Sequence, residues 1–160
     1  MSTCDDLEFY RSFHQNSINK LIHFFCIPLI MISVINLLTP LRPKIKIKLK
    51  EFVPYLQVNM GQFIPTMFVY YYFFQYGLKI GFVMTIYIRF LLFISESWRE
   101  IDKEWYKHSK FLFVIAWIMQ FIGHGIEGNR PALITSLKQS VFQAPVFTLE
   151  YIYPSLLSSL

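Results

Sequence analysis

Three histidines, accompanied by a glutamate and a glutamine, are the residues of this sequence whose types and positions best suit chemistry. His14 and His23 flank the start of the first apolar segment, and His124 lies near the end of a later one. Imidazole nitrogens bind first-row divalent metals, and a site with three such ligands leaves positions open for a substrate or for oxygen. We therefore hypothesise a metal site formed by these three histidines.

The spacing of the first two histidines restricts how they can meet. His14 and His23 are nine residues apart, so a continuous helix would place them on opposite sides and ~13 Å apart along its axis. The polar segment Gln15-Asn16-Ser17 supplies a break that would let His14 fold back over the next helix. Both imidazoles can then contribute to one site.

Polar residues accompany two of the histidines at helical spacing. Asn19 lies four residues before His23, and Gln120, His124 and Glu127 follow an i, i+4, i+7 pattern. Each set falls on one face of a helix. Polar groups inside a membrane segment are costly unless they are paired, so we expect these residues to have a function.

The composition is that of a membrane protein. Of 160 residues, 54% are hydrophobic and only 16% are charged, whereas a soluble domain carries roughly 25% charged residues. The length suits one integral-membrane domain, residues 1–160, because four or five spans of ~20 residues would use most of it. The net charge of +5 does not indicate a nucleic-acid partner, because the basic residues lie in loops between apolar segments. Cys4 and Cys26 are too few for a disulfide framework, so we expect free thiols.

Apolar segments separated by polar or helix-breaking residues predict where the helices lie. Ser17 is a suitable N-cap for the first span, and Tyr76-Gly77 predicts a tight hairpin between the second and third. The predicted spans are Leu21–Leu38, Phe52–Tyr76, Leu78–Ile94 and Phe111–Ile126, with an interfacial helix at Asp5–Phe13, a charged loop or exposed helix at Ser95–Lys110, and a fifth span or interfacial helix at Ala132–Tyr153. We expect an all-α, multi-pass membrane helical bundle with four or five spans and an N-terminal interfacial helix.

Counting spans indicates which polar residues can share a site. If the first four spans all cross the membrane, the start of the first and the end of the fourth lie on the same side. His14, His23, His124 and Glu127 then share one face of the membrane. His108 precedes the fourth span, so we expect it on the opposite face as a solvated loop residue. A re-entrant second segment would overturn this argument.

The same residues also fit structural roles. Histidines at the ends of spans often lie at the headgroup level, and Gln120 and Glu127 could join helices through hydrogen bonds. Arg130 could meet a substrate carboxylate or anchor the chain at the membrane interface. A non-catalytic membrane adaptor or membrane-shaping protein is therefore the alternative, in which loss of His124 would change stability and not metal content. A transporter is disfavoured, because the sequence has too few spans and no repeated pair of broken helices.

Two segments of the sequence resemble a known family. The segments FYRSFHQNSINKLIHFFCIPLI and WIMQFIGHGIEGNRPALITSLKQSVFQAPVFTLEYIY are similar to the fungal-type 2-hydroxy fatty acid dioxygenases, the Mpo1-like proteins. The middle of the chain, Thr39 to Lys110, carries no motif of that family. The resemblance therefore concerns the two regions that hold the candidate ligands.

The resemblance implies a multi-pass enzyme of the endoplasmic-reticulum membrane that uses ferrous iron, Fe2+, and molecular oxygen. Its substrate would be a 2-hydroxy fatty acid, such as the 2-hydroxypalmitate of phytosphingosine breakdown, which it would shorten by one carbon. By motif position, the metal ligands would be His14, His23 and His124, and the catalytic residues Glu127 and Gln120. We expect Asn19 and Arg130 to contact the substrate. The sequence leaves the oligomeric state, the substrate chain length and a fourth metal ligand open.

Overall fold

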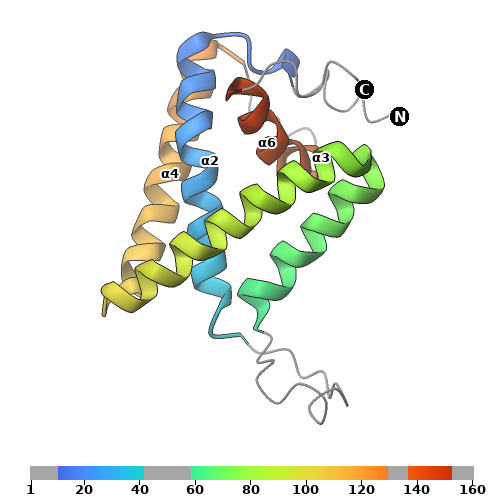
Figure 1. The fold of residues 1–160 in the computed structure, drawn as a ribbon. Helices are drawn as coiled ribbons and strands as arrows, with labels where there is room; N and C mark the ends of the chain where they lie inside the picture. The colour runs from blue at the N-terminus through green and yellow to red at the C-terminus, as the bar shows by residue number, and fades with distance from the viewer. Residues whose placement is uncertain (1–10, 42–58, 130–136, 153–160) are drawn as a thin grey trace.

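Four helices make up most of the part of the chain that the structure describes. A computed structural model describes residues 11–41, 59–129 and 137–152. Within these ranges it has no strand, and its helices are α2 (Ser17–Leu38), α3 (Met60–Ile101), α4 (Trp105–Glu127) and α6 (Leu137–Ile152). Figure 1 shows α2 and α4 running side by side, with α3 crossing α2. The helix α6 lies near the upper end of α2, where α2 begins. The predicted all-α helical bundle is confirmed.

Three of these helices, α2, α3 and α4, are long and apolar enough to cross a membrane. The 22 residues of α2 and the 23 residues of α4 extend about 33 and 35 Å at the rise of an α-helix. These lengths match a hydrocarbon core of ~30 Å. Large apolar side chains lie on the outside of the bundle, such as Phe74, Ile86 and Phe111, which are 90%, 72% and 67% exposed. Such outward faces suit contact with lipid.

A glycine divides α3 into two arms. Gly77 has φ 76° and ψ −174°, a conformation that is open to glycine but strained for residues with a Cβ. Figure 1 shows the two arms, green and yellow-green, meeting at a sharp bend. The hairpin predicted at this position is therefore present, and α3 contains both the second and the third predicted spans. Residues 52–58 of the predicted second span lie outside the described residues.

The segment Ser95–Lys110 is mostly helical. The second arm of α3 runs on to Ile101, and α4 already begins at Trp105. Asp102 stabilises the turn between them, because its carboxylate accepts hydrogen bonds from the indole of Trp98 at 2.9 Å and from the backbone amide of Glu104 at 2.9 Å. The prediction of an exposed helix therefore describes this segment better than the prediction of a loop.

The first span begins earlier than predicted. Asn16, and not Ser17, is the N-cap of α2, and its side-chain oxygen accepts a hydrogen bond from the amide of Ile18 at 2.8 Å. Asparagine and serine are about equally good N-caps, so residue preference alone could not decide between these neighbours. Of the interfacial helix predicted at Asp5–Phe13, only the end is described, where Arg11 and Ser12 are helical.

The C-terminal helix α6 packs into the bundle and is shorter than a typical span. Its 16 residues extend about 24 Å. The hydroxyl of Tyr72 donates to the carbonyl of Phe142 at 3.0 Å, and the hydroxyl of Tyr76 donates to the side chain of Gln143. Val146 is completely buried in the main core, among residues of α2 and α3. Within the described residues α6 is a helix packed against the bundle and is not among the helices long and apolar enough to cross a membrane. For the whole segment, the choice between a fifth span and an interfacial helix stays a prediction.

A buried polar cluster joins three helices at the end of the bundle where α2 finishes. The side chain of Asn36 accepts hydrogen bonds from Ser95 at 2.6 Å and Arg99 at 2.8 Å, and donates one to Ser109 at 3.0 Å. Asn36, Ser95 and Ser109 are all 0% exposed. These bonds fix the relative positions of α2, α3 and α4, because a polar group away from water is stable only when it is paired.

The opposite end of α2 lies close against α4, where Gly123 faces Asn19. A Cβ on Gly123 would lie 2.4 Å from the side-chain oxygen of Asn19, which is closer than non-bonded atoms approach. A Cβ on Gly125, only two residues later, would meet nothing within 4 Å. The missing side chain at Gly123 therefore allows the two helices to come together at the histidines.

We predict that Gly123→Ala lowers the melting temperature of the detergent-purified protein. The added methyl group would displace Asn19, and overpacking of this kind costs about 1–3 kcal/mol. Gly125→Ala is the matched control and should be neutral or stabilising by up to ~1 kcal/mol, because alanine is the better helix former. Thermal unfolding followed by circular dichroism compares the two variants, and equal melting temperatures would contradict the prediction.

Candidate metal centre

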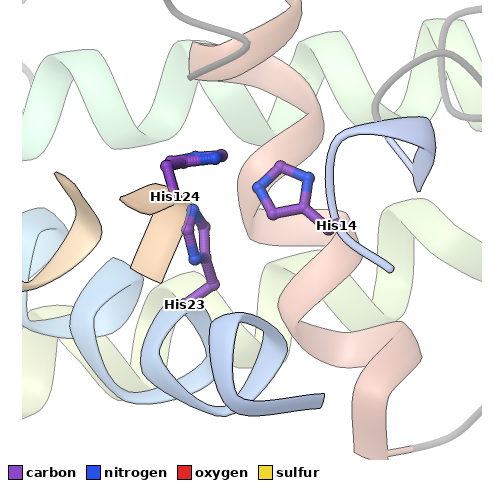
Figure 2. Close-up of side chains that lie close together, drawn as sticks. All are labelled: His14, His23 and His124. Carbon is purple, nitrogen blue, oxygen red and sulfur yellow. The ribbon is translucent and has the colours of Figure 1, made fainter. Parts of the chain in front are cut away.

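Three imidazoles from distant parts of the chain meet at the upper end of the bundle. His14 precedes α2, His23 lies in its second turn, and His124 lies in the last turn of α4. One nitrogen of each ring lies within 4.8 Å of the corresponding nitrogens of the other two. The ring centroids are 4.4, 4.9 and 4.9 Å apart. Figure 2 shows the three rings gathered around a common space.

The fold brings these rings together in the way that span counting indicates. Because α2 and α4 run side by side in opposite directions, the start of one lies next to the end of the other. His14 joins them because the chain turns before α2, where its amide donates to the carbonyl of Arg11 at 3.0 Å. His14, His23 and His124 are only 1%, 2% and 5% exposed. Water is thus largely excluded from the cluster.

The backbone sets the tautomer of His23. Its Nδ1 lies 3.0 Å from the carbonyl oxygen of Asn19. A carbonyl can only accept, so Nδ1 carries the proton and donates it, and Nε2 keeps its lone pair. Histidines that bind metals commonly donate their second ring N–H to such a group, which fixes the orientation of the ring. His23 is therefore held in the protonation state that a metal ligand requires.

His124 offers a second sign that the cluster suits a metal ion. Its Nδ1 is buried and has no hydrogen-bond partner among the described residues. A buried polar atom without a partner costs about 1–3 kcal/mol, and coordination to a metal would remove that cost. Three buried imidazole nitrogens are a suitable ligand set for a first-row divalent ion, and they leave positions open for other ligands.

The carboxylate of Glu127 fastens the segment that carries His14. Its oxygens accept hydrogen bonds from the backbone amides of Gln15 at 2.6 Å and Asn16 at 2.9 Å, and from the side chain of Asn19 at 2.8 Å. We call Glu127 with these three donors the Glu127 clamp. The clamp connects the last turn of α4 to the first turn of α2 and to the residue after His14.

The remaining predicted site residues lie in different surroundings. Gln120 is 6% exposed, one turn before His124, and its Nε2 has no hydrogen-bond partner among the described residues. Asn19 is completely buried and takes part in the Glu127 clamp. Arg130 lies outside the described residues. Cys26 is a buried free thiol, as expected, and Cys4 lies outside the described residues.

His108 lies far from the cluster, at the start of α4, as span counting predicts. Its Nδ1 is 2.6 Å from a carboxylate oxygen of Asp102. This hydrogen bond from His108, aided by that from Trp98, holds the pKa of Asp102 below its usual value. The ring is half exposed, so His108 stabilises the turn between α3 and α4 and takes no part in the histidine cluster.

A cavity beside His14 is the feature of this region that the sequence did not indicate. It has a volume of about 470 Å³ and is lined in part by Lys20, Phe147 and Tyr151. The aromatic pair comes from α6, and the ring of Phe147 lies 5.0 Å from that of His14. Only the packing of α6 against the N-terminal segment creates this space, so no local pattern could have predicted it.

We predict that Glu127→Gln loosens the segment before α2. A neutral amide is a weaker acceptor than a carboxylate, and a hydrogen bond to a charged group contributes about 1.5–3 kcal/mol. Amide hydrogen exchange of peptides that contain Gln15 and Asn16 should therefore accelerate about tenfold or more. Glu100→Gln, an exposed substitution on α3, is the matched control. Unchanged exchange in the Glu127 variant would contradict the role of the clamp.

Comparison with known proteins places these residues in a family. The chain is 33% identical over 145 residues to a protein of Saccharomyces cerevisiae named 2-hydroxy-palmitic acid dioxygenase MPO1, and the match covers 88% of this chain and 74% of the yeast protein. No solved structure is significantly similar. The sequence model of a family described as 2-hydroxy-palmitic acid dioxygenase Mpo1-like matches residues 2–156. The chain therefore belongs to the Mpo1-like family.

Proposed function

We propose that this protein is an Fe2+-dependent dioxygenase that shortens 2-hydroxy fatty acids by one carbon. The observation that carries the proposal is the buried cluster of His14, His23 and His124, with ligand nitrogens within 4.8 Å of one another. Its yeast relative is named a 2-hydroxy-palmitic acid dioxygenase, which supports the class of substrate. A metal site enclosed in a membrane bundle is a reasonable place for oxygen chemistry on a lipid.

The histidine cluster suits ferrous iron in this role. Its three neutral nitrogen donors would hold the ion and leave positions for both oxygen and substrate. When bound, the iron would supply the redox chemistry between O2 and the 2-hydroxy acid. The protonated Nδ1 of His23, donating to the carbonyl of Asn19, would keep the opposite nitrogen directed at the ion. Burial of the rings would protect the reaction from water.

The proposed reaction balances without an external reductant. The bond between C1 and C2 of the substrate breaks, and C2 is oxidised from an alcohol to a carboxylic acid. One O2 accepts the electrons that are released, and the products are the acid one carbon shorter, CO2 and water. The protein therefore needs only to bind the metal, the substrate and oxygen.

Two polar residues near the cluster receive different proposed roles. We assign Glu127 as a positioning residue, because its carboxylate already accepts hydrogen bonds from Gln15, Asn16 and Asn19. The amide nitrogen of Gln120 is buried on the same face of α4 as His124 and has no hydrogen-bond partner among the described residues, so it can donate a hydrogen bond to an oxygen of the bound substrate. The side-chain nitrogen of Asn19 acts through Glu127, and its buried oxygen, which has no hydrogen-bond partner among the described residues, can accept a hydrogen bond from the substrate.

The lipid bilayer would deliver the substrate. A long-chain 2-hydroxy acid partitions into the membrane with its polar end at the interface. In a bilayer spanned by α2 and α4, the histidine cluster at the ends of these helices would lie at the same level. The apolar outer faces of the helices suit contact with the acyl chain. We propose the endoplasmic-reticulum membrane as the location, which imaging of a fluorescently tagged chain beside a reticulum marker would test.

We predict that His124→Ala abolishes both metal binding and turnover. Purified protein reloaded with ferrous iron should convert 2-hydroxypalmitate aerobically to the acid one carbon shorter, as measured by mass spectrometry. Loss of a ligand should lower the rate more than about 100-fold, since even residues that only support ligands contribute 10–100-fold. Iron content, measured by plasma mass spectrometry, should fall in parallel.

His108→Ala is the matched control for this experiment, because His108 lies half exposed at the other end of α4. That variant should retain its iron and its activity. Turnover that survives in the His124 variant, or an iron-loaded parent that makes no product, would contradict the proposal. A folded parent that binds no metal would favour a non-catalytic membrane protein.

A further inference from the structure

The cavity beside His14 has the lining that a lipid with a negatively charged end requires. Its polar residues include Gln15, Ser17 and Lys20, and its apolar ones are the aromatic residues Phe147 and Tyr151 of α6. Its volume of about 470 Å³ is within the usual range of small-molecule sites, ~300–1,000 Å³. The polar residues can bind a charged head group, and the aromatic residues can pack against the first carbons of a hydrocarbon chain.

Among the described residues that line this cavity, Lys20 is the cation that is available for a ligand. Arg11 also lines it, but its guanidinium forms an ion pair with Glu150, with Nε 3.1 Å from a carboxylate oxygen. The side chain of Lys20 forms no hydrogen bond or ion pair with any described residue. Because the charges of Arg11 and Glu150 cancel, Lys20 gives the described lining of the cavity a net positive charge.

The position of Lys20 relates the cavity directly to the candidate metal centre. Lys20 and His23 are three residues apart on α2 and therefore lie on the same side of the helix. His14 belongs to both features, since it lines the cavity and its ring contacts those of His23 and His124. An anion bound by Lys20 would thus lie next to the metal ligands.

We infer that Lys20 binds the carboxylate of the long-chain 2-hydroxy acid, with Phe147 and Tyr151 packing against the carbons beyond it. The inference deepens the proposed function and rests on it for the identity of the ligand. The predicted contacts of Asn19 and Arg130 with the substrate stay predictions, and Arg130 lies outside the described residues. The amide of Asn19 is already bonded to Glu127, which leaves its nitrogen poorly placed for a substrate carboxylate.

Binding to the metal-free protein tests this assignment independently of turnover. The full chain, purified in detergent without added metal, would be titrated with 2-hydroxypalmitate and with its uncharged methyl ester by microscale thermophoresis. We expect the acid to bind more tightly than the ester. Lys20→Gln should weaken binding of the acid about tenfold, or 1.4 kcal/mol, and leave binding of the ester unchanged.

Two further variants separate the charge of Lys20 from general effects. Lys20→Arg should keep most of the preference for the acid, because it keeps the positive charge. Lys103→Gln removes an exposed charge from the turn between α3 and α4 and should bind like the parent. A Lys20→Gln variant that retains the preference for the acid would overturn the assignment, and so would a loss of preference in Arg11→Gln alone.

A phospholipid headgroup offers similar negative charge, so lysophosphatidic acid of the same chain length is the competing probe. Stronger Lys20-dependent binding of this phosphate than of the carboxylate would overturn the inference in favour of a headgroup site. Preference for the acid that depends on Lys20 in a protein without turnover would leave the inference standing and refute the proposed function. Turnover in a protein that shows no Lys20-dependent preference for the acid would overturn the inference and leave the proposed function standing.

Discussion

The candidate site depends on one carboxylate that connects the end of α4 to the start of α2 and to the segment before it. Glu127, in the last turn of α4, accepts hydrogen bonds from the backbone amides of Gln15 and Asn16, just before α2, and from the side chain of Asn19. The first amides of a helix have no partner within it, and a negative charge there also interacts favourably with the helix dipole. This contact holds the segment of His14 against α4, and the ion pair between Arg11 and Glu150 holds the same segment against α6.

The two ends of the bundle use buried polar groups in different ways. At one end, Asn36 and its neighbours satisfy one another, so their hydrogen bonds need no further partner. At the other end, the buried Nδ1 of His124 and the amide of Gln120 have no partner among the described residues. Buried polar atoms without a partner among the described residues also occur elsewhere, such as the hydroxyls of Ser33 and Tyr87. It is therefore the gathering of three imidazoles, together with these costly unpaired atoms, that favours ligand binding at the histidine end.

The arrangement also suits a substrate that is itself half polar and half apolar. The histidine cluster lies where two membrane-length helices end, and the cavity beside it combines the charge of Lys20 with the rings of Phe147 and Tyr151. A 2-hydroxy fatty acid can present its carboxyl end to such a site while its chain stays in apolar surroundings. The imidazoles, the positive charge and the aromatic wall come from three different parts of the chain: α2 with the segment before it, α4, and α6.

By itself, the sequence determined that the protein is a bundle of membrane-length helices and that His14, His23 and His124 can meet at one end of it. Those conclusions follow from properties that are local or countable, namely the length of apolar segments, the break at Gly77, and the number of crossings between the histidines. Only the tertiary structure decided that Glu127 holds the backbone of Gln15 and Asn16, that α6 folds back over His14, and that Lys20 lines a cavity. These contacts join residues far apart in the chain and depend on the register of α2 against α4 and on the packing of α6, which no periodicity of the sequence encodes.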